Sequence, residues 1–249
     1  MSGDGGRVFA EALAAESRER GRLNLRPRDA ATLILLDRSG GAIKVLLGRR
    51  HAGHKFMPGK FVFPGGRVER SDRHMSVADP LATIVEEKLN ARPRRASAHL
   101  GRALALAAVR ETYEETGLAL GLKQAAGVSA APAGAWSRFS AAKVVPALGG
   151  VDFLARAITP PGRPRRFDTR FLVADAALIA HREGGVVGPE AELVELVWMP
   201  LAEASALDLP SITRIVLGEL AAAMTTGMNP TRPRPFFYQH HGAWRRDEL

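Results

Sequence analysis

The chain of 249 residues has no cysteine. Disulfide bonds, thiolate metal sites and a cysteine nucleophile are therefore excluded, and oxygen-ligated metal chemistry remains as the natural option. No apolar run approaches the ~18 residues of a membrane span. Charged side chains also interrupt the amino-terminal segment 8–20, so we expect neither a signal peptide nor a membrane partner. Together these absences predict a cytoplasmic protein.

Aromatic residues are scarce, at 6%, and there is no aromatic RNA-binding signature, zinc finger or helix-turn-helix pattern. Nucleic acid is therefore not the expected partner, although the formal net charge is +9. The basic side chains are scattered along the chain, which a solvated basic surface explains. The functional alternative is an electropositive funnel that attracts a phosphorylated small molecule.

The composition indicates one domain. An apolar content of 46% and the absence of an internal repeat fit a single core. We expect an amino-terminal helix or extension over 1–28, one domain over 29–227 with an insertion at about 73–102, and a carboxyl-terminal tail over 228–249.

Short apolar runs bounded by glycine, proline and aspartate predict strands that alternate with helices. The first two strands form a hairpin around 37–41. Helices are expected over 81–89, with Asp79 as the N-cap, over 104–116 and over 212–224. This pattern predicts an α/β fold with a mixed sheet between helices. The predicted strands cover 30–36, 42–48, 61–63, 67–69, 144–147, 151–155, 170–174 and 193–199.

Three carboxylates stand close together near the end of the helix predicted over 104–116. Glu111, Glu114 and Glu115 are spaced i, i+3 and i+4, so they project from one helix surface, and Gly117 ends the helix. Like charges at this spacing repel, whereas a hard divalent cation binds carboxylate oxygens and removes the repulsion. A solvated acidic helix face explains these three residues equally well.

A second segment distinguishes these two readings. Residues 61–69 read as a short strand, a glycine turn and another strand, and together with 110–118 they resemble the Nudix box. The positions that match are Gly66, Arg110, Glu111, Glu114, Glu115, Gly117 and Leu118. Two positions depart from the pattern, because Asp72 stands where the family has glutamate and Thr112 replaces an aliphatic residue.

The resemblance implies a Nudix-type α/β/α sandwich with a helical insertion within the box, and hydrolysis of a diphosphate linkage that depends on Mg²⁺ or Mn²⁺. Its implied metal ligands are Glu111, Glu114, Glu115 and the backbone of Gly66. Arg110 would orient carboxylates such as Asp72. A homodimer is common in the family, although no residue of this chain demonstrates one.

The spacing inside the box suggests a branch of the family. Thirty-seven residues separate Asp72 from Arg110, far more than the usual spacer. This insertion, with the runs 45–51 and 56–66, resembles the CoA and acyl-CoA diphosphatases of the peroxisomal type. The implied products are 3′,5′-ADP and a phosphopantetheine. The alternatives are hydrolysis of ADP-ribose, NADH or a diadenosine polyphosphate, and a non-catalytic module that binds a nucleotide.

Substrate-binding candidates come from the same resemblance. Arg49, Arg50 and Lys55 occupy the basic signature of the CoA-type enzymes. In the loop 163–166, Arg163, Arg165 and Arg166 are candidates for contact with a 3′-phosphate or a diphosphate, while a solvated loop is the simpler reading. Of these three arginines, we predict Arg166 as a substrate-binding residue.

The general base has several candidates, because Nudix enzymes take it from different places. Glu111 or Glu115 could activate water directly. The loop acids Glu190, Glu192 and Glu195 precede or begin the predicted strand 193–199, and Glu192 and Glu195 are the candidates that we retain.

Overall fold

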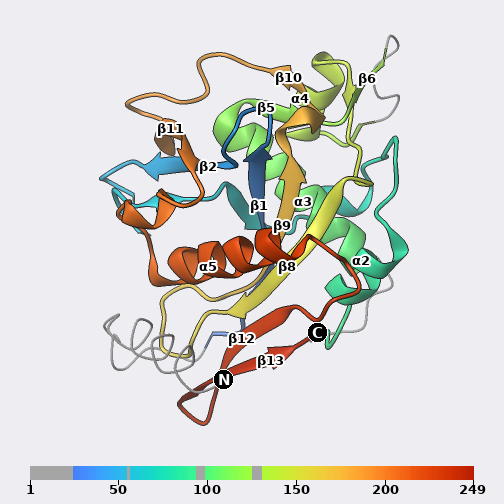
Figure 1. The fold of residues 1–249 in the computed structure, drawn as a ribbon. Helices are drawn as coiled ribbons and strands as arrows, with labels where there is room; N and C mark the ends of the chain where they lie inside the picture. Colours follow the sequence, from blue (N-terminus) through green and yellow to red (C-terminus); the bar gives the residue numbers. More distant parts are fainter. Residues whose placement is uncertain (1–24, 55–56, 94–98, 125–130) are drawn as a thin grey trace.

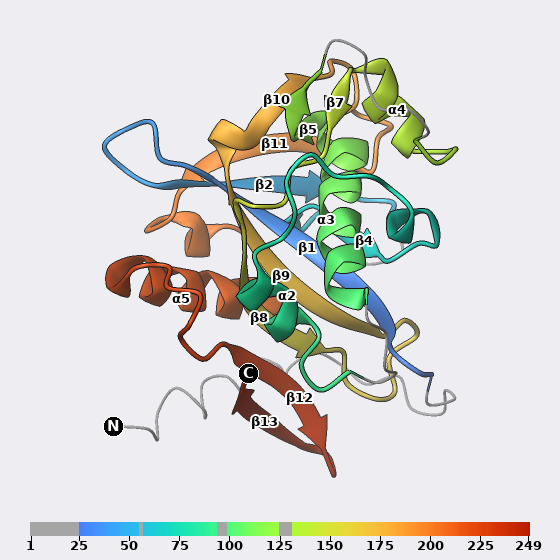
Figure 2. The same ribbon diagram turned by 90° about the vertical axis from the view of Figure 1, so that its right-hand side faces the viewer.

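The computed structural model describes residues 25–54, 57–93, 99–124 and 131–249. They form an α/β/α sandwich in which a mixed sheet lies between α3 (Leu100–Thr116) on one face and α5 (Ser211–Thr226) on the other (Figures 1 and 2). The predicted fold class is confirmed. None of the helices in these ranges combines the length and the apolar character needed to cross a membrane. The helix predicted within 1–24 lies outside the described residues.

The central sheet contains nine strands among the described residues, in the order β11-β2-β1-β9-β8-β12-β13, with β3 on β2 and β4 on β1. The pairs β1–β9 and β8–β12 are parallel, and the remaining pairs are antiparallel. The strands are β1 (Arg28–Asp37), β2 (Lys44–Arg50), β3 (Phe61–Val62), β4 (Gly65–Arg67), β8 (Val151–Ile158), β9 (Phe167–Asp175), β11 (Leu193–Pro200), β12 (Pro235–His240) and β13 (Ala243–Glu248).

Strand β1 lies in the middle of the sheet and is buried on both faces. Leu33 and Leu35 pack in the core cluster on the α3 side, whereas Ile34 and Leu36 pack in the cluster on the α5 side. Successive side chains of a strand point to opposite faces, so a continuous apolar run serves both layers. The antiparallel hairpin of β1 and β2 confirms the prediction for these segments.

Helix α3 carries the acidic residues, and it begins four residues before its predicted start. It is buried along most of its length, because it packs between the sheet, α2 (Thr83–Leu89) and smaller elements. Gly117 ends it with φ 74°, and its N–H donates to the carbonyl of Tyr113. Glycine adopts this left-handed conformation without a steric penalty, so the predicted helix end is confirmed.

The described part of the insertion includes α2, which packs against the core. Val85 and Leu89 of α2 are buried in the cluster that includes Leu104 of α3. The predicted cap is wrong: Ala82 is the N-cap residue of α2, and Asp79 forms an isolated β-bridge with Ala147. The helix therefore starts later than the Asp-Pro signal indicates, because the backbone of Asp79 pairs with another segment.

The residues predicted as a carboxyl-terminal tail, 228–249, include two strands. β12 pairs with β8 in parallel, and β13 pairs with β12, so this hairpin extends the main sheet at one edge. Phe237 of β12 is buried in the core cluster on the α5 side. The remaining elements are η1 (Ser71–Arg73), β5 (Leu118–Leu120), β6 (Leu122–Lys123), α4 (Trp136–Ala141), β7 (Val144–Val145), η2 (Ala176–Leu178), β10 (Ile179–Arg182) and η3 (Ala204–Ala206).

Candidate active site

A buried ion pair links the two halves of the sequence motif. Nε of Arg110 donates to Oδ1 of Asp72 at 2.7 Å, and Nη2 donates to Oδ2 at 3.2 Å. Asp72 also accepts hydrogen bonds from the Glu69 backbone N–H at 2.7 Å and from Nε1 of Trp136 at 3.1 Å. Both charged side chains are almost fully buried, and a buried pair is stable when hydrogen bonds satisfy its remaining atoms.

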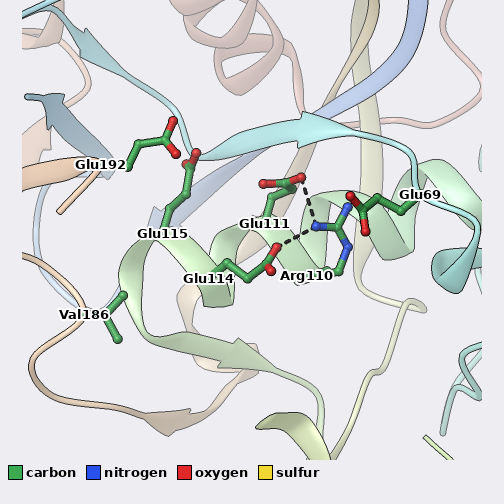
Figure 3. Close-up of a pocket in the computed structure, with 7 residues that line it drawn as sticks. All are labelled: Glu69, Arg110, Glu111, Glu114, Glu115, Val186 and Glu192. Carbon is green, nitrogen blue, oxygen red and sulfur yellow. Dashed lines mark hydrogen bonds and ion pairs between the residues drawn. The ribbon is translucent and has the colours of Figure 1, made fainter. Parts of the chain in front are cut away.

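The same guanidinium holds two of the predicted metal ligands. Nη1 of Arg110 contacts Glu111 at 2.9 Å and Glu114 at 2.5 Å. Figure 3 shows these side chains around one pocket, with Glu115 and Glu192 facing it from the other side. The pocket has a volume of about 330 Å³ and is lined by Glu69, Arg110, Glu111, Glu114, Glu115, Val186 and Glu192.

The two glycines before this pocket belong to strand β4, not to a turn as the sequence suggested. The N–H of Gly65 donates to Oε2 of Glu115 at 3.1 Å, and Gly66 pairs with Ala31 of β1. A Cβ on Gly66 would lie 2.3 Å from Oε1 of Glu111. A Cβ at this position would therefore force the Glu111 carboxylate or the strand to move.

Burial makes these carboxylates hard to ionise in the absence of a cation. Burial raises the pKa of Glu111 to about 7, although the Arg110 guanidinium opposes the shift. Burial also raises the pKa of Glu115 well above its ordinary value, and the charges of Glu192 and Glu111 add to the effect. Such shifts indicate a place where an additional positive charge would be favourable.

The carboxylates do not converge as a finished ligand set. Among the residues that the structure describes, no three aspartate, glutamate or histidine side chains are arranged to hold a metal ion. The physical reason is that Arg110 engages Glu111 and Glu114 from one side, while Glu115 points toward β4. The donor set nevertheless fits a hard divalent cation, since four glutamates besides Glu69 line one small pocket.

Glu192 lines the acidic pocket and an adjoining cleft, and Arg50 lines that cleft beside it. Nη2 of Arg50 lies 2.9 Å from Oε1 of Glu192 and 4.0 Å from Oε1 of Glu115. His54 contacts both, with Nδ1 2.9 Å from Nη1 of Arg50 and Nε2 3.5 Å from Glu192. The motif did not point to His54 or Glu69, because both reach the site through loops around the matched positions.

Several of the predicted substrate-binding and general-base residues do not line the acidic pocket. Arg49 pairs with Glu195 at 2.8 Å, both side chains are about half exposed, and neither lines the pocket or the adjoining cleft. Arg166 donates to the carbonyl oxygens of Thr159 at 3.0 Å and Leu25 at 2.7 Å, and it does not line the cleft. Lys55 lies outside the described residues.

A larger cleft adjoins the acidic pocket on the α5 side of the sheet. Its volume is about 640 Å³, and Arg50, Glu111, Glu115 and Glu192 line one part of it. The rest crosses β1, β9 and β8 and is mostly apolar. The apolar and basic lining residues farther from the carboxylates include Phe63, Ile158, Arg163, Arg165, Phe167, Phe171, Ile212 and Trp244.

Solved structures with a similar fold are Nudix proteins. A Nudix hydrolase from Alicyclobacillus acidocaldarius is 29% identical, with a TM-score of 0.59 over 80% of this chain and 96% of its own. The Nudix hydrolase RenU from M. smegmatis is 20% identical, with a TM-score of 0.44 over 84% and 92% of the two chains. The Nudix domain of Shewanella oneidensis NrtR, solved with ADP ribose, is 13% identical, with a TM-score of 0.43 over 86% and 97%.

No family model and no curated relative matches the sequence. The fold is nevertheless that of the Nudix hydrolases. This likeness supports a Nudix diphosphatase enzyme.

Proposed function

We propose that the chain hydrolyses the diphosphate linkage of CoA or acyl-CoA and releases 3′,5′-ADP and a phosphopantetheine. The observation that carries this proposal is the cleft of about 640 Å³, which joins the carboxylates of Glu111 and Glu115 to a long apolar and basic compartment. A volume of this size is within the range of sites for small molecules. Arg50 lines the acidic part of the cleft and supports the CoA-type resemblance.

Glu111, Glu114, Glu115 and the backbone carbonyl of Gly66 would hold Mg²⁺ or Mn²⁺. When bound, such an ion supplies positive charge to phosphate oxygens and helps to orient the substrate. The Asp72–Arg110 pair serves as a positioning unit, since Arg110 contacts the carboxylates of Glu111 and Glu114 and is itself fixed by Asp72.

Glu192 is our candidate for the general base. It is 43% exposed and lines both the acidic pocket and the cleft, so water can reach its carboxylate. In the proposed step Glu192 accepts a proton from water, the water oxygen bonds to one phosphorus, and the bridging P–O bond breaks. Glu195, paired with Arg49 outside these cavities, does not fit this role.

A product assay tests the substrate. Purified protein with Mg²⁺ would be given CoA, acetyl-CoA, a long-chain acyl-CoA, ADP-ribose, NADH and diadenosine polyphosphates, and the products would be identified by mass. We expect 3′,5′-ADP from the CoA species and none from the Glu115→Gln variant. If CoA stays intact while AMP appears from another nucleotide, the CoA assignment is wrong, and the diphosphatase chemistry stands.

A further inference from the structure

The acidic side chains of the cleft gather at one end, where Arg50 accompanies them. Glu111, Glu115 and Glu192 lie at one end, beside β4 and β11. Arg163 and Arg165 line the cleft from the loop between β8 and β9. The sheet order places β8 and β9 on the other side of β1 from β2 and β11, so the two groups of charges lie across the sheet from each other.

The basic end also carries aromatic side chains. Phe167 enters from the first residue of β9, and Trp244 enters from β13 in the carboxyl-terminal hairpin. Trp244 packs on the core cluster of the α5 side, and Ile212 at the start of α5 lines the cleft as well. Flat rings of nucleotide bases bind to surfaces of this kind through stacking and apolar contact.

The hairpin that carries Trp244 is fixed to the domain. Phe237 is 1% exposed in the core, and Nε of Arg246 lies 3.3 Å from Oε1 of Glu219 on α5. Trp244 pairs with Gln239 in the antiparallel register, which puts it on the same face as Phe237 and Arg246. The wall of the cleft formed by Trp244 is therefore held in place before a ligand enters.

We propose that this basic and aromatic end binds the nucleotide part of the substrate and recognises a phosphate monoester on its ribose. The diphosphate would be held at the acidic end, where a bound divalent cation would offset the charge of the glutamates. Arg163 and Arg165 are then placed for a second phosphate at a distance from the first, and arginine forms strong hydrogen bonds with phosphate. The inference rests on the proposed diphosphatase function. It adds a selection rule, which is that substrates with a phosphate monoester on the ribose are preferred to those without it.

Two pairs of substrates test the rule. CoA differs from dephospho-CoA, and NADPH from NADH, by one phosphate monoester. We expect kcat/KM with Mg²⁺ to be at least about tenfold higher for the phosphorylated member of any pair that is cleaved, because hydrogen bonds to a charged group are involved. Equal kcat/KM values within each cleaved pair would overturn the proposal.

Substitutions test whether Arg163 and Arg165 recognise the phosphate monoester. Arg165→Gln, and the double variant Arg163→Gln with Arg165→Gln, should bring the ratio within each pair close to one. Arg245→Gln is the matched control, because it removes the same charge from an exposed residue of β13 that does not line the cleft. Trp244→Phe and Trp244→Ala should raise KM for both members of a pair and leave the ratio unchanged. An undiminished ratio in the double arginine variant would exclude these residues.

A binding measurement separates the selection rule from the choice of substrate. Calorimetry with Mg²⁺ should show that adenosine 3′,5′-bisphosphate binds at least about tenfold more tightly than 5′-AMP. If CoA is not cleaved but NADPH is preferred to NADH, the CoA assignment fails and the selection rule stands. If no pair is cleaved, equal binding of the two adenosine phosphates would overturn the rule, and preferential binding would support it.

Discussion

Gly66 of β4 approaches Glu111 of α3 so closely that a Cβ would stand 2.3 Å from Oε1 of the carboxylate. Gly66→Ala must therefore displace the Glu111 side chain or the strand. We expect kcat/KM to fall by at least about a hundredfold, because small displacements at a reacting centre are costly. Steady-state assays over a range of Mg²⁺ concentrations would measure the change.

Gly40→Ala is the control for this substitution. Gly40 lies between β1 and β2, and a Cβ there would meet no atom within 4 Å. We expect its activity to equal that of the unmodified protein. An active Gly66→Ala variant with unchanged Mg²⁺ dependence would show that the close approach has no functional meaning.

The second prediction concerns the stability of the metal-free protein. Burial raises the pKa of Glu111 from 4.5 to about 7, so between these pH values the folded state binds more protons than the unfolded state. The free energy of unfolding therefore decreases as pH rises through this window, by up to about 3 kcal/mol from this group. Urea denaturation with EDTA at several pH values would measure it.

The variant Glu111→Gln removes the titrating group and isolates this effect. The unmodified protein should lose stability relative to Glu111→Gln between pH 4.5 and 7, the window that the pKa shift defines. At high pH, Mg²⁺ should restore the stability that the unmodified protein loses, because a cation stabilises the ionised carboxylates. A relative gain in stability across the same window would mean that the contact with Arg110 outweighs burial.

Helical spacing was sufficient to place the glutamates together. Glu111, Glu114 and Glu115 follow from a period of 3.6 residues, and they do face one pocket. Spacing could not show that Arg110 engages two of them, since that arrangement depends on Asp72, 38 positions away in the sequence. Which buried charges contact one another is determined by the tertiary structure.

The sequence also does not show which residues of a strand face the cleft. Arg49 and Arg50 are neighbours on β2, so their side chains point to opposite faces of the sheet and only one of them can line the cleft. The basic signature of the sequence contains both arginines and does not show which of them lines the cleft. Trp136 and Trp244 were not predicted at all, because they reach the site and the cleft from segments without a local motif.

The third prediction distinguishes two glutamates that lie three positions apart in the sequence, Glu192 and Glu195. Glu192→Gln should lower kcat by about a hundredfold or more at its optimal pH, since a positioned base contributes roughly 10² to 10⁴ to a rate. Glu195→Gln should keep its activity, because Glu195 pairs with Arg49 away from the pocket. The assay is the pH profile of kcat for both variants. Equal activities of the two variants would mean that another residue, such as Glu111, is the general base.

The fourth prediction compares two buried aspartates that each pair with arginine. Asp72 contacts Arg110 at the site, whereas Asp168 contacts Arg156 at 2.8 and 2.7 Å and Arg170 at 3.2 Å within the sheet. Asp168 is therefore a structural residue of strand β9. Asp72→Asn and Asp168→Asn should each cost on the order of 3 kcal/mol of unfolding free energy, because an arginine remains buried without its full partner.

The two variants should differ in activity, and this difference separates positioning from stability. At a temperature where both remain folded by circular dichroism, Asp168→Asn should keep the kcat of the unmodified protein, because Arg156 and Arg170 do not line the acidic pocket. Asp72→Asn should lose most of its kcat, since Arg110 would no longer be held against Glu111 and Glu114. A parallel loss in both variants would mean that Asp72 acts only through the stability of the fold.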